Sequence, residues 1–126
     1  MKDLNKVFLL GRLGSQPVRR ETKNGTVVTH FSMATSKKTK VGGEEGVESE
    51  LKEETQWHKV VVWGKQGEVC AQYLQKGNPV LVEGSMRSRK YDDSSGVSRM
   101  SFEIHAESIS FLPRWTNQIA HHDSPG

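Results

Sequence analysis

Two tryptophans stand six positions apart in the stretch WHKVVVWGK, which runs from Trp57 to Lys65. If this stretch is a strand, one face carries Trp57, Lys59, Val61 and Trp63 and the other carries His58, Val60 and Val62, because successive side chains point to opposite faces. An outward row of large aromatic rings lowers solubility and therefore indicates a binding role. Nucleobases of any sequence stack on such rings, with about 1–3 kcal/mol per base, and neighbouring lysines can contact phosphates. The alternative is that both tryptophans are core and the valines face a partner; the lysine in the row favours stacking.

Two further basic clusters could contact phosphates. Arg87 and Arg89 alternate with Tyr91 and have Lys90 beside them, so they repeat the combination of cations with an aromatic ring. An ordinary charged hairpin arm is the alternative for this cluster. The other cluster precedes an acidic segment and is equally well explained as solvated loop charges; it consists of Lys37, Lys38 and Lys40.

Constellations typical of enzymes are absent from the sequence. Neither a G-x-x-x-x-G-K-[ST] phosphate loop nor a G-x-G-x-x-G turn occurs. The single cysteine, Cys70, excludes an internal disulfide and has the spacing of a core residue in a predicted helix. No Cys/His spacing suggests zinc. We therefore predict a protein that is not an enzyme and that uses no metal and no cofactor.

Composition and charge agree with one small basic domain. The chain has 126 residues, of which 33% are hydrophobic and 26% charged, and its net charge is +3. Residues 41–56 contain six glutamates and one lysine, so the rest of the chain carries a net charge of +8. A basic body of this kind attracts polyanions. No apolar run approaches the roughly 18 residues of a membrane helix, and we expect a cytoplasmic protein with no membrane association.

Short strands and one helix are the elements that must position these residues. The helix is predicted for residues 65–76, where apolar residues recur at helical spacing before Gly77. Asn24-Gly25 predicts a hairpin, and residues 37–54 predict a long flexible loop, with a β-hairpin that orders on binding as the alternative. The strands are predicted at residues 6–13, 18–23 with 26–35, 55–63, 79–91 and 97–106, with 112 as the alternative end of the last strand. This order predicts an all-β fold, the five-stranded oligonucleotide-binding (OB) barrel with one α-helix between strands 3 and 4.

Several motifs resemble bacterial single-stranded-DNA-binding proteins in order and spacing. They are NKVFLLGRLGSQP, NGTVVTHFSMATS, TQWHKVVVWGK, YLQKGNPVLVEG and MRSRKYDDSSG, and the resemblance covers residues 4–112. It implies an OB-fold homotetramer that wraps single-stranded DNA with little sequence preference. It also implies that the protein protects this DNA in replication, recombination and repair, in association with the nucleoid.

The resemblance assigns expected roles residue by residue. Trp57 and Trp63 stand where bases stack in the family, and Tyr91 stands where a stacking tryptophan is usual. Backbone contacts are implied for Arg12, Lys65, Lys76, Arg87, Arg89 and Lys90, and Lys37, Lys38 and Lys59 complete the expected DNA-binding set. Subunit contacts are implied for Asn5, Lys6, Val7, Leu9 and His58.

Two departures from the family pattern change the expectations. Thr39 stands where the family commonly has a tryptophan, so binding should rely more on charge and fall steeply with salt. The chain ends in HHDSPG without the family's acidic tip, so recruitment of repair enzymes through such a tip is not expected. We expect residues 1–112 to form the DNA-binding domain and residues 113–126 a short disordered tail.

Two other functions remain alternatives. A primosome-type accessory protein shares the barrel, lacks the tip, is usually a dimer and acts in replication restart. A barrel of another class grips a protein or an oligosaccharide on the same face.

Overall fold

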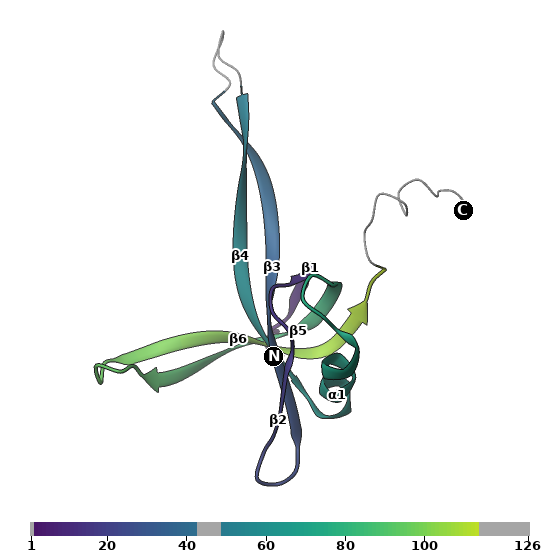
Figure 1. Ribbon diagram of the computed structural model, residues 1–126. Helices are drawn as coiled ribbons and strands as arrows, with labels where there is room; N and C mark the ends of the chain where they lie inside the picture. The colour runs from purple at the N-terminus through teal and green to yellow at the C-terminus, as the bar shows by residue number, and fades with distance from the viewer. Residues whose placement is uncertain (1, 43–48, 114–126) are drawn as a thin grey trace.

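The computed structural model describes residues 2–42 and 49–113, which form one barrel with two long hairpins projecting from it (Figure 1). The sheet has the strand order β1-β5-β6-β4-β3-β2, and an additional β1–β3 pairing closes the barrel. The helix lies between β4 and β5, as predicted. The elements are β1 (Val7–Leu13), β2 (Val18–Glu21), β3 (Val27–Gly42), β4 (Ser49–Trp63), α1 (Gly64–Tyr73), β5 (Pro79–Asp92) and β6 (Ser98–Phe111).

The predicted five-stranded barrel with one helix is confirmed, with β2 and β3 as the two arms of the strand pair that Asn24-Gly25 joins. Gly25 has a φ of 82°, the left-handed conformation that this hairpin turn requires. Closure depends on two register pairs near the end of β1, Arg12 with Ala34 and Leu13 with Met33. Strands β4 and β6 are parallel where they meet, so β6 runs beside the tryptophan-bearing strand.

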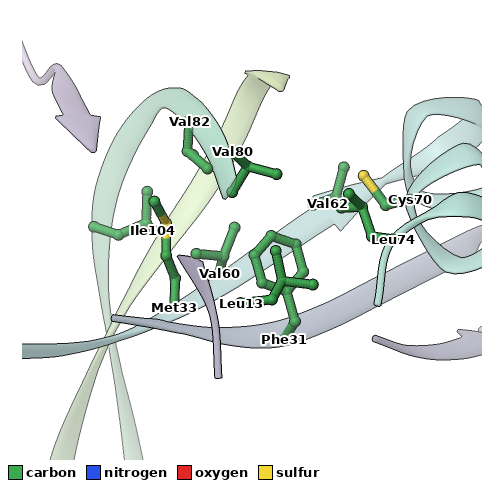
Figure 2. Close-up of a cluster of buried hydrophobic side chains, with 10 residues drawn as sticks. All are labelled: Leu13, Phe31, Met33, Val60, Val62, Cys70, Leu74, Val80, Val82 and Ile104. Carbon is green, nitrogen blue, oxygen red and sulfur yellow. The ribbon is translucent and has the colours of Figure 1, made fainter. Parts of the chain in front are cut away.

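The core is formed by inward-facing side chains of the barrel and one face of α1 (Figure 2). Val60 and Val62 of β4 are fully buried, which confirms that the valine row of this strand faces inward. Residues from five elements pack with them: Leu13, Phe31, Met33, Cys70, Leu74, Val80, Val82 and Ile104.

Helix α1 lies directly against the barrel because Gly67 has no side chain. A Cβ at Gly67 would lie 2.5 Å from the Val62 carbonyl oxygen, and the Thr29 hydroxyl donates a 2.7 Å hydrogen bond to the Gly67 carbonyl oxygen. Cys70 on this face is fully buried, and burial raises the pKa of its thiol to about 11. The thiol is therefore protonated at neutral pH and acts as a packing group.

The flexible loop predicted for residues 37–54 is wrong for the described residues, which form two paired strands as in the β-hairpin alternative; ordering of this hairpin on binding remains a prediction. The β3–β4 pairing continues from Val28 opposite Trp63 to Gly42 opposite Ser49. We name this extension, residues 37–42 with 49–54, the β-ribbon. The apolar alternation of a half-buried strand is absent because the ribbon extends beyond the core, and lysines opposite glutamates replace it. Residues 43–48 and the predicted tail from 114 onward lie outside the described residues.

Candidate nucleic-acid interface

The outward face of β4 carries the two tryptophans, as the strand period predicted. Trp57 is 64% exposed and Trp63 is 47% exposed, and the Lys59 side chain projects between them. Val61 was predicted on the same outward face but is buried, among the side chains that line one cleft with it. The alternative, in which both tryptophans are core, is therefore excluded.

A cleft of about 660 Å³ lies beside Trp63, within the size range of small-molecule sites. Its floor is apolar and includes Val28 and Val61. Its cations come from β2, β4 and β5, three strands distant in sequence. We name this space the basic cleft; its cationic lining residues are Arg20, Lys59, Arg87 and Arg89.

One buried carboxylate lies among these cations. Glu103 is 6% exposed; its Oε2 is 3.3 Å from Lys59 Nζ and its Oε1 is 3.2 Å from His105 Nε2. Burial raises the pKa of Glu103, but the hydrogen bonds from His105 and Lys59 outweigh burial and lower the pKa overall. Glu103 is therefore ionised at neutral pH, and the cleft keeps an excess of positive charge.

The Trp63 indole is held at the wall of this cleft. Its Nε1–H donates a 3.2 Å hydrogen bond to His105 Nδ1. The two rings are nearly parallel, with centroids 6.5 Å apart and an interplanar angle of 25°. One edge of the indole is therefore held by His105, and the exposed part of the ring is open to a ligand.

A second cleft of about 490 Å³ surrounds Trp57. A Cβ on Gly14 would lie 2.1 Å from the indole, so glycine at this position lets the ring lie on the chain after β1. The exposed ring of Phe102 lines the same cleft, which makes it a third aromatic surface. Lys59 and His30 line both clefts, so the two spaces adjoin along β4.

The pKa of His30 reflects its burial and the positive charges around it. Burial lowers the pKa of His30, and the nearby charges of Lys59 and Arg20 lower it further. The imidazole is therefore neutral at physiological pH, and it lines the clefts as a hydrogen-bonding group and not as a further cation.

The predicted DNA-binding residues are thus only partly brought together. Five of the twelve line the two clefts: Trp57, Lys59, Trp63, Arg87 and Arg89. Tyr91 and Lys90 lie farther along the β5–β6 hairpin, both exposed. The remaining five are exposed on β1, the ribbon, α1 and the turn after α1, and they line neither cleft; they are Arg12, Lys37, Lys38, Lys65 and Lys76.

Sequence reasoning missed residues that reach the clefts from β2, β3 and β6. Arg20 belongs to a short charged strand whose sequence resembles any exposed hairpin. Alternation along β6 placed Glu103 and His105 on one face, and this was the available signal, but nothing in the sequence indicated that this face adjoins β4. The residues missed are Arg20, His30, Phe102, Glu103 and His105.

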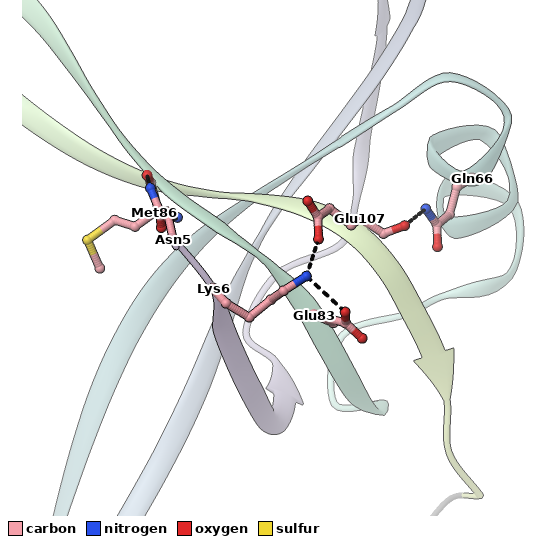
Figure 3. A network of polar contacts seen from close by, with 6 residues as sticks. All are labelled: Asn5, Lys6, Gln66, Glu83, Met86 and Glu107. Atoms are coloured by element: carbon pink, nitrogen blue, oxygen red, sulfur yellow. Dashed lines mark hydrogen bonds and ion pairs between the residues drawn. The ribbon is translucent and has the colours of Figure 1, made fainter. Parts of the chain in front are cut away.

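The residues expected at subunit contacts have partners within the chain (Figure 3). The Asn5 amide exchanges hydrogen bonds of 2.8 and 3.0 Å with the Met86 backbone. Lys6 Nζ donates hydrogen bonds to Glu107 at 2.7 Å and to Glu83 at 3.1 Å, and these bonds, the one to Glu107 most of all, raise the pKa of Lys6. That Asn5 and Lys6 contact another subunit remains a prediction.

The rest of the expected subunit-contact set is also placed by the structure. Val7 and Leu9 pack against the core, whereas Phe8 and Leu10 expose their side chains on the other face of β1. His58 Nε2 is 2.9 Å from the Thr35 hydroxyl. The exposed apolar face of β1 is therefore formed by Phe8 and Leu10.

Neither a metal-binding cluster nor a membrane-spanning helix occurs among the described residues. No group of three or more His, Cys, Asp or Glu residues that could hold a metal ion occurs within residues 2–42 and 49–113. In the same described segments, no helix is long and apolar enough to cross a membrane.

Comparisons with known proteins agree with this geometry. Residues 4–112 match the profile of the single-strand binding protein family. Single-stranded DNA-binding protein 1 of Chlorobaculum tepidum is 40% identical over 112 residues, which are 88% of this chain and 66% of that protein. This chain thus spans somewhat less than two thirds of the length of that curated relative.

A solved structure supports the same assignment. The structure described as "Plasmodium falciparum SSB complex with ssDNA" superposes with a TM-score of 0.78 at 31% identity, covering 90% of this chain and 98% of that chain. The family consists of DNA-binding proteins that are not enzymes, in agreement with the prediction made from the sequence. From the matched residues, the shared identity and the barrel, the chain belongs to the single-strand binding protein family.

Proposed function

We propose that this protein binds single-stranded DNA with little sequence preference and protects it during replication, recombination and repair. The observation that carries the proposal is the exposed pair Trp57 and Trp63 on one face of β4, beside clefts that hold an excess of cations. Unpaired bases would stack on the indoles, and phosphates would lie near the arginines and lysines. Since genomic single strands are the proposed ligand, we place the protein at the nucleoid in the cytoplasm.

The geometry favours a single strand over a duplex. Stacking on an indole requires an unpaired base whose flat face is accessible, and every base offers such a face. The two clefts also combine cations with aromatic rings, which can contact phosphates and base faces whatever the sequence. Recognition of this kind is strong and tolerant of sequence.

Titration of intrinsic fluorescence with a dT oligomer tests this function. We expect strong quenching in the native protein, and Trp57→Ala with Trp63→Ala should weaken binding about 30-fold or more, since each stacked base contributes about 1–3 kcal/mol. Binding of the double variant is followed by anisotropy of a labelled oligomer. The matched control is Tyr73→Ala, which removes a ring of 62% exposure on α1, away from the clefts.

The control separates stacking from a general loss of exposed aromatic surface. Tyr73→Ala should bind the oligomer as the native protein does. Native-like affinity of the double tryptophan variant, or equal losses in both variants, would refute the stacking interface.

We also propose that the protein is a homotetramer. The supporting feature is β1, where the Phe8 and Leu10 side chains form an exposed apolar face beside a strand edge that pairs with β3 only at Arg12 and Leu13. Native mass spectrometry with and without a dT oligomer reports subunit number and DNA stoichiometry together. Phe8→Ser with Leu10→Ser should lower the subunit number; a native dimer would instead favour the primosome-type alternative.

A further inference from the structure

Hydrogen-bond chemistry assigns the proton positions around Trp63. An indole N–H can only donate, so His105 Nδ1, at 3.2 Å from Trp63 Nε1, must be an unprotonated acceptor. In a neutral imidazole the proton then resides on Nε2, and this nitrogen donates to Glu103 Oε1 at 3.2 Å. The three groups therefore form a chain of donors that runs in one direction, from Trp63 through His105 to Glu103.

The far end of this chain is firmly anchored. Glu103 is buried and ionised, and its second oxygen accepts from Lys59 Nζ at 3.3 Å. A buried carboxylate with both oxygens occupied fixes the orientation of the groups that donate to it. Trp63 is half-exposed on β4, and its polar contact to His105 on β6 joins two strands that separate beyond their short parallel pairing.

We propose that Glu103 and His105 are positioning residues for the stacking indole of Trp63, and that protonation of His105 releases this indole. An imidazolium carries protons on both nitrogens, so it cannot accept the Trp63 N–H. Acid would therefore convert a fixed aromatic platform into a freely rotating one. The proposal rests on the proposed function for its effect on DNA, but the release itself is a property of the free protein.

The charged surroundings of His105 are mixed. Glu103 on β6 contacts it directly, and Lys59 on β4 lies on the other side of that carboxylate. The other charged and titratable groups that line the same cleft are Arg87 and Arg89 on β5, Arg20 on β2 and His30 on β3. Because all variants described below share these groups, the groups do not account for differences between the variants.

The added charge on His105 and the release of Trp63 predict opposite effects of acid on DNA binding. A protonated His105 adds a positive charge to the cleft, which by itself strengthens attraction to phosphates. Release of Trp63 removes a preorganised stacking surface, which weakens binding. We expect the loss of the platform to be the larger effect, because the neighbouring carboxylate of Glu103 neutralises much of the added charge.

The variant His105→Asn separates the two effects. Asparagine can present an oxygen at the distance of Nδ1 from the backbone, so it keeps an acceptor for Trp63, and it takes up no proton in this pH range. His105→Phe keeps a flat ring against the indole and removes the acceptor altogether. His105→Asn should therefore keep the contact to the Trp63 N–H that His105→Phe loses.

The first experiment is performed on the free protein. The indole ¹⁵N–¹H resonance of Trp63, assigned by its absence in Trp63→Phe, is followed from about pH 8 to about pH 5, where imidazoles titrate. We expect a shift with pH in the native protein, no corresponding shift in His105→Asn, and a free-indole position at every pH in His105→Phe. A pH-independent Trp63 resonance in the native protein would overturn the proposal.

The second experiment measures the affinity of a dT oligomer at the two ends of this pH range. His105→Phe should bind about 3–10-fold more weakly than the native protein at high pH, which corresponds to about 0.7–1.4 kcal/mol. On acidification the native protein should lose affinity relative to His105→Asn; a relative gain would show that charge and not position governs, and would overturn the proposal.

The outcomes distinguish this proposal from the proposed function. If the Trp63 resonance responds as expected but the native protein does not bind the oligomer, the function fails and the positioning stands. If the native protein and all variants bind equally at both pH values, the function stands and the positioning role fails. Should His105→Phe not fold, the native protein and His105→Asn decide the question alone.

Discussion

The basic cleft and the β-ribbon both carry several cations, yet their surroundings differ. In the ribbon, Lys37 and Lys38 stand opposite Glu54 and Glu53 of the adjacent strand. In the cleft, cations from three strands line one concave space, and the Glu103 carboxylate that lies among them is buried and already paired. The ribbon therefore compensates its own charge, whereas the cleft retains a positive charge for a ligand.

Aromatic rings mark the second difference between the two regions. Trp63 lies at the wall of the cleft, and Trp57 with Phe102 lines the adjoining one. On the described β3 arm of the ribbon, Thr39 stands at the position where the resemblance leads one to expect a tryptophan. A lysine cluster alone is thus a weak indicator of DNA binding, and the combination of uncompensated cations with accessible rings is a strong one.

The sharpest test of this difference removes two cations from each region. Arg87→Ala with Arg89→Ala should weaken binding of a dT oligomer about 10–100-fold at low salt and reduce the log–log salt slope by about 1.4, because each phosphate contact contributes about 0.7. Lys37→Ala with Lys38→Ala should cost less than about fivefold. Affinities measured across a salt series check both; equal losses would remove the distinction between cleft and ribbon.

Stability should differ between the regions as binding does. Val62 is fully buried beneath the cleft-bearing face of the barrel, and Val62→Ala should lower the free energy of unfolding by about 2 kcal/mol through lost burial and a cavity. Leu51 on the ribbon is exposed, and Leu51→Ala should change it by less than about 0.5 kcal/mol. Urea unfolding at one protein concentration compares them. A ribbon variant as costly as the core variant would show that the ribbon packs against something in solution.

Removing the negative charges of two ribbon glutamates should give the ribbon an uncompensated positive charge like that of the cleft. Glu53→Gln with Glu54→Gln leaves the opposite lysines uncompensated, so affinity for a dT oligomer should rise about 2–5-fold at low salt, the range expected for exposed charges. The gain should vanish at high salt because such charges are screened. Unchanged or weaker binding at low salt would indicate that the ribbon stays clear of the DNA.

The smallest expected effect concerns the pH dependence of stability. The pKa of His30 is lowered by burial and then by Lys59 and Arg20, so the unfolded chain takes up this proton more readily than the folded protein. Stability should therefore decrease as the pH falls from above about 6.5 through the lowered pKa of His30. His30→Gln should reduce this decrease, as thermal unfolding at several pH values can measure. A profile identical to that of the native protein would argue against the cause assigned to His30.

Local patterns in the sequence were sufficient for much of the barrel. The period of two in β4 correctly placed Val60 and Val62 inside and both tryptophans outside, and the helical spacing before Gly77 correctly located α1. These features depend on neighbours in the chain, which sequence displays directly. The ribbon was predicted as strand only in the alternative to a loop, because its cross-strand pairs of lysine and glutamate leave no apolar period to detect.

The sequence by itself determined which rings and cations are available and which face of β4 carries them, because strand geometry alternates side chains whatever the fold. Only the tertiary structure decided which of them meet. Closure of the barrel brings Arg20, Arg87 and His105 to the same space as Trp63, and it leaves Arg12 and Lys65 elsewhere. The physical reason is that register between strands far apart in the chain depends on how the whole sheet closes around its core, which no local pattern encodes.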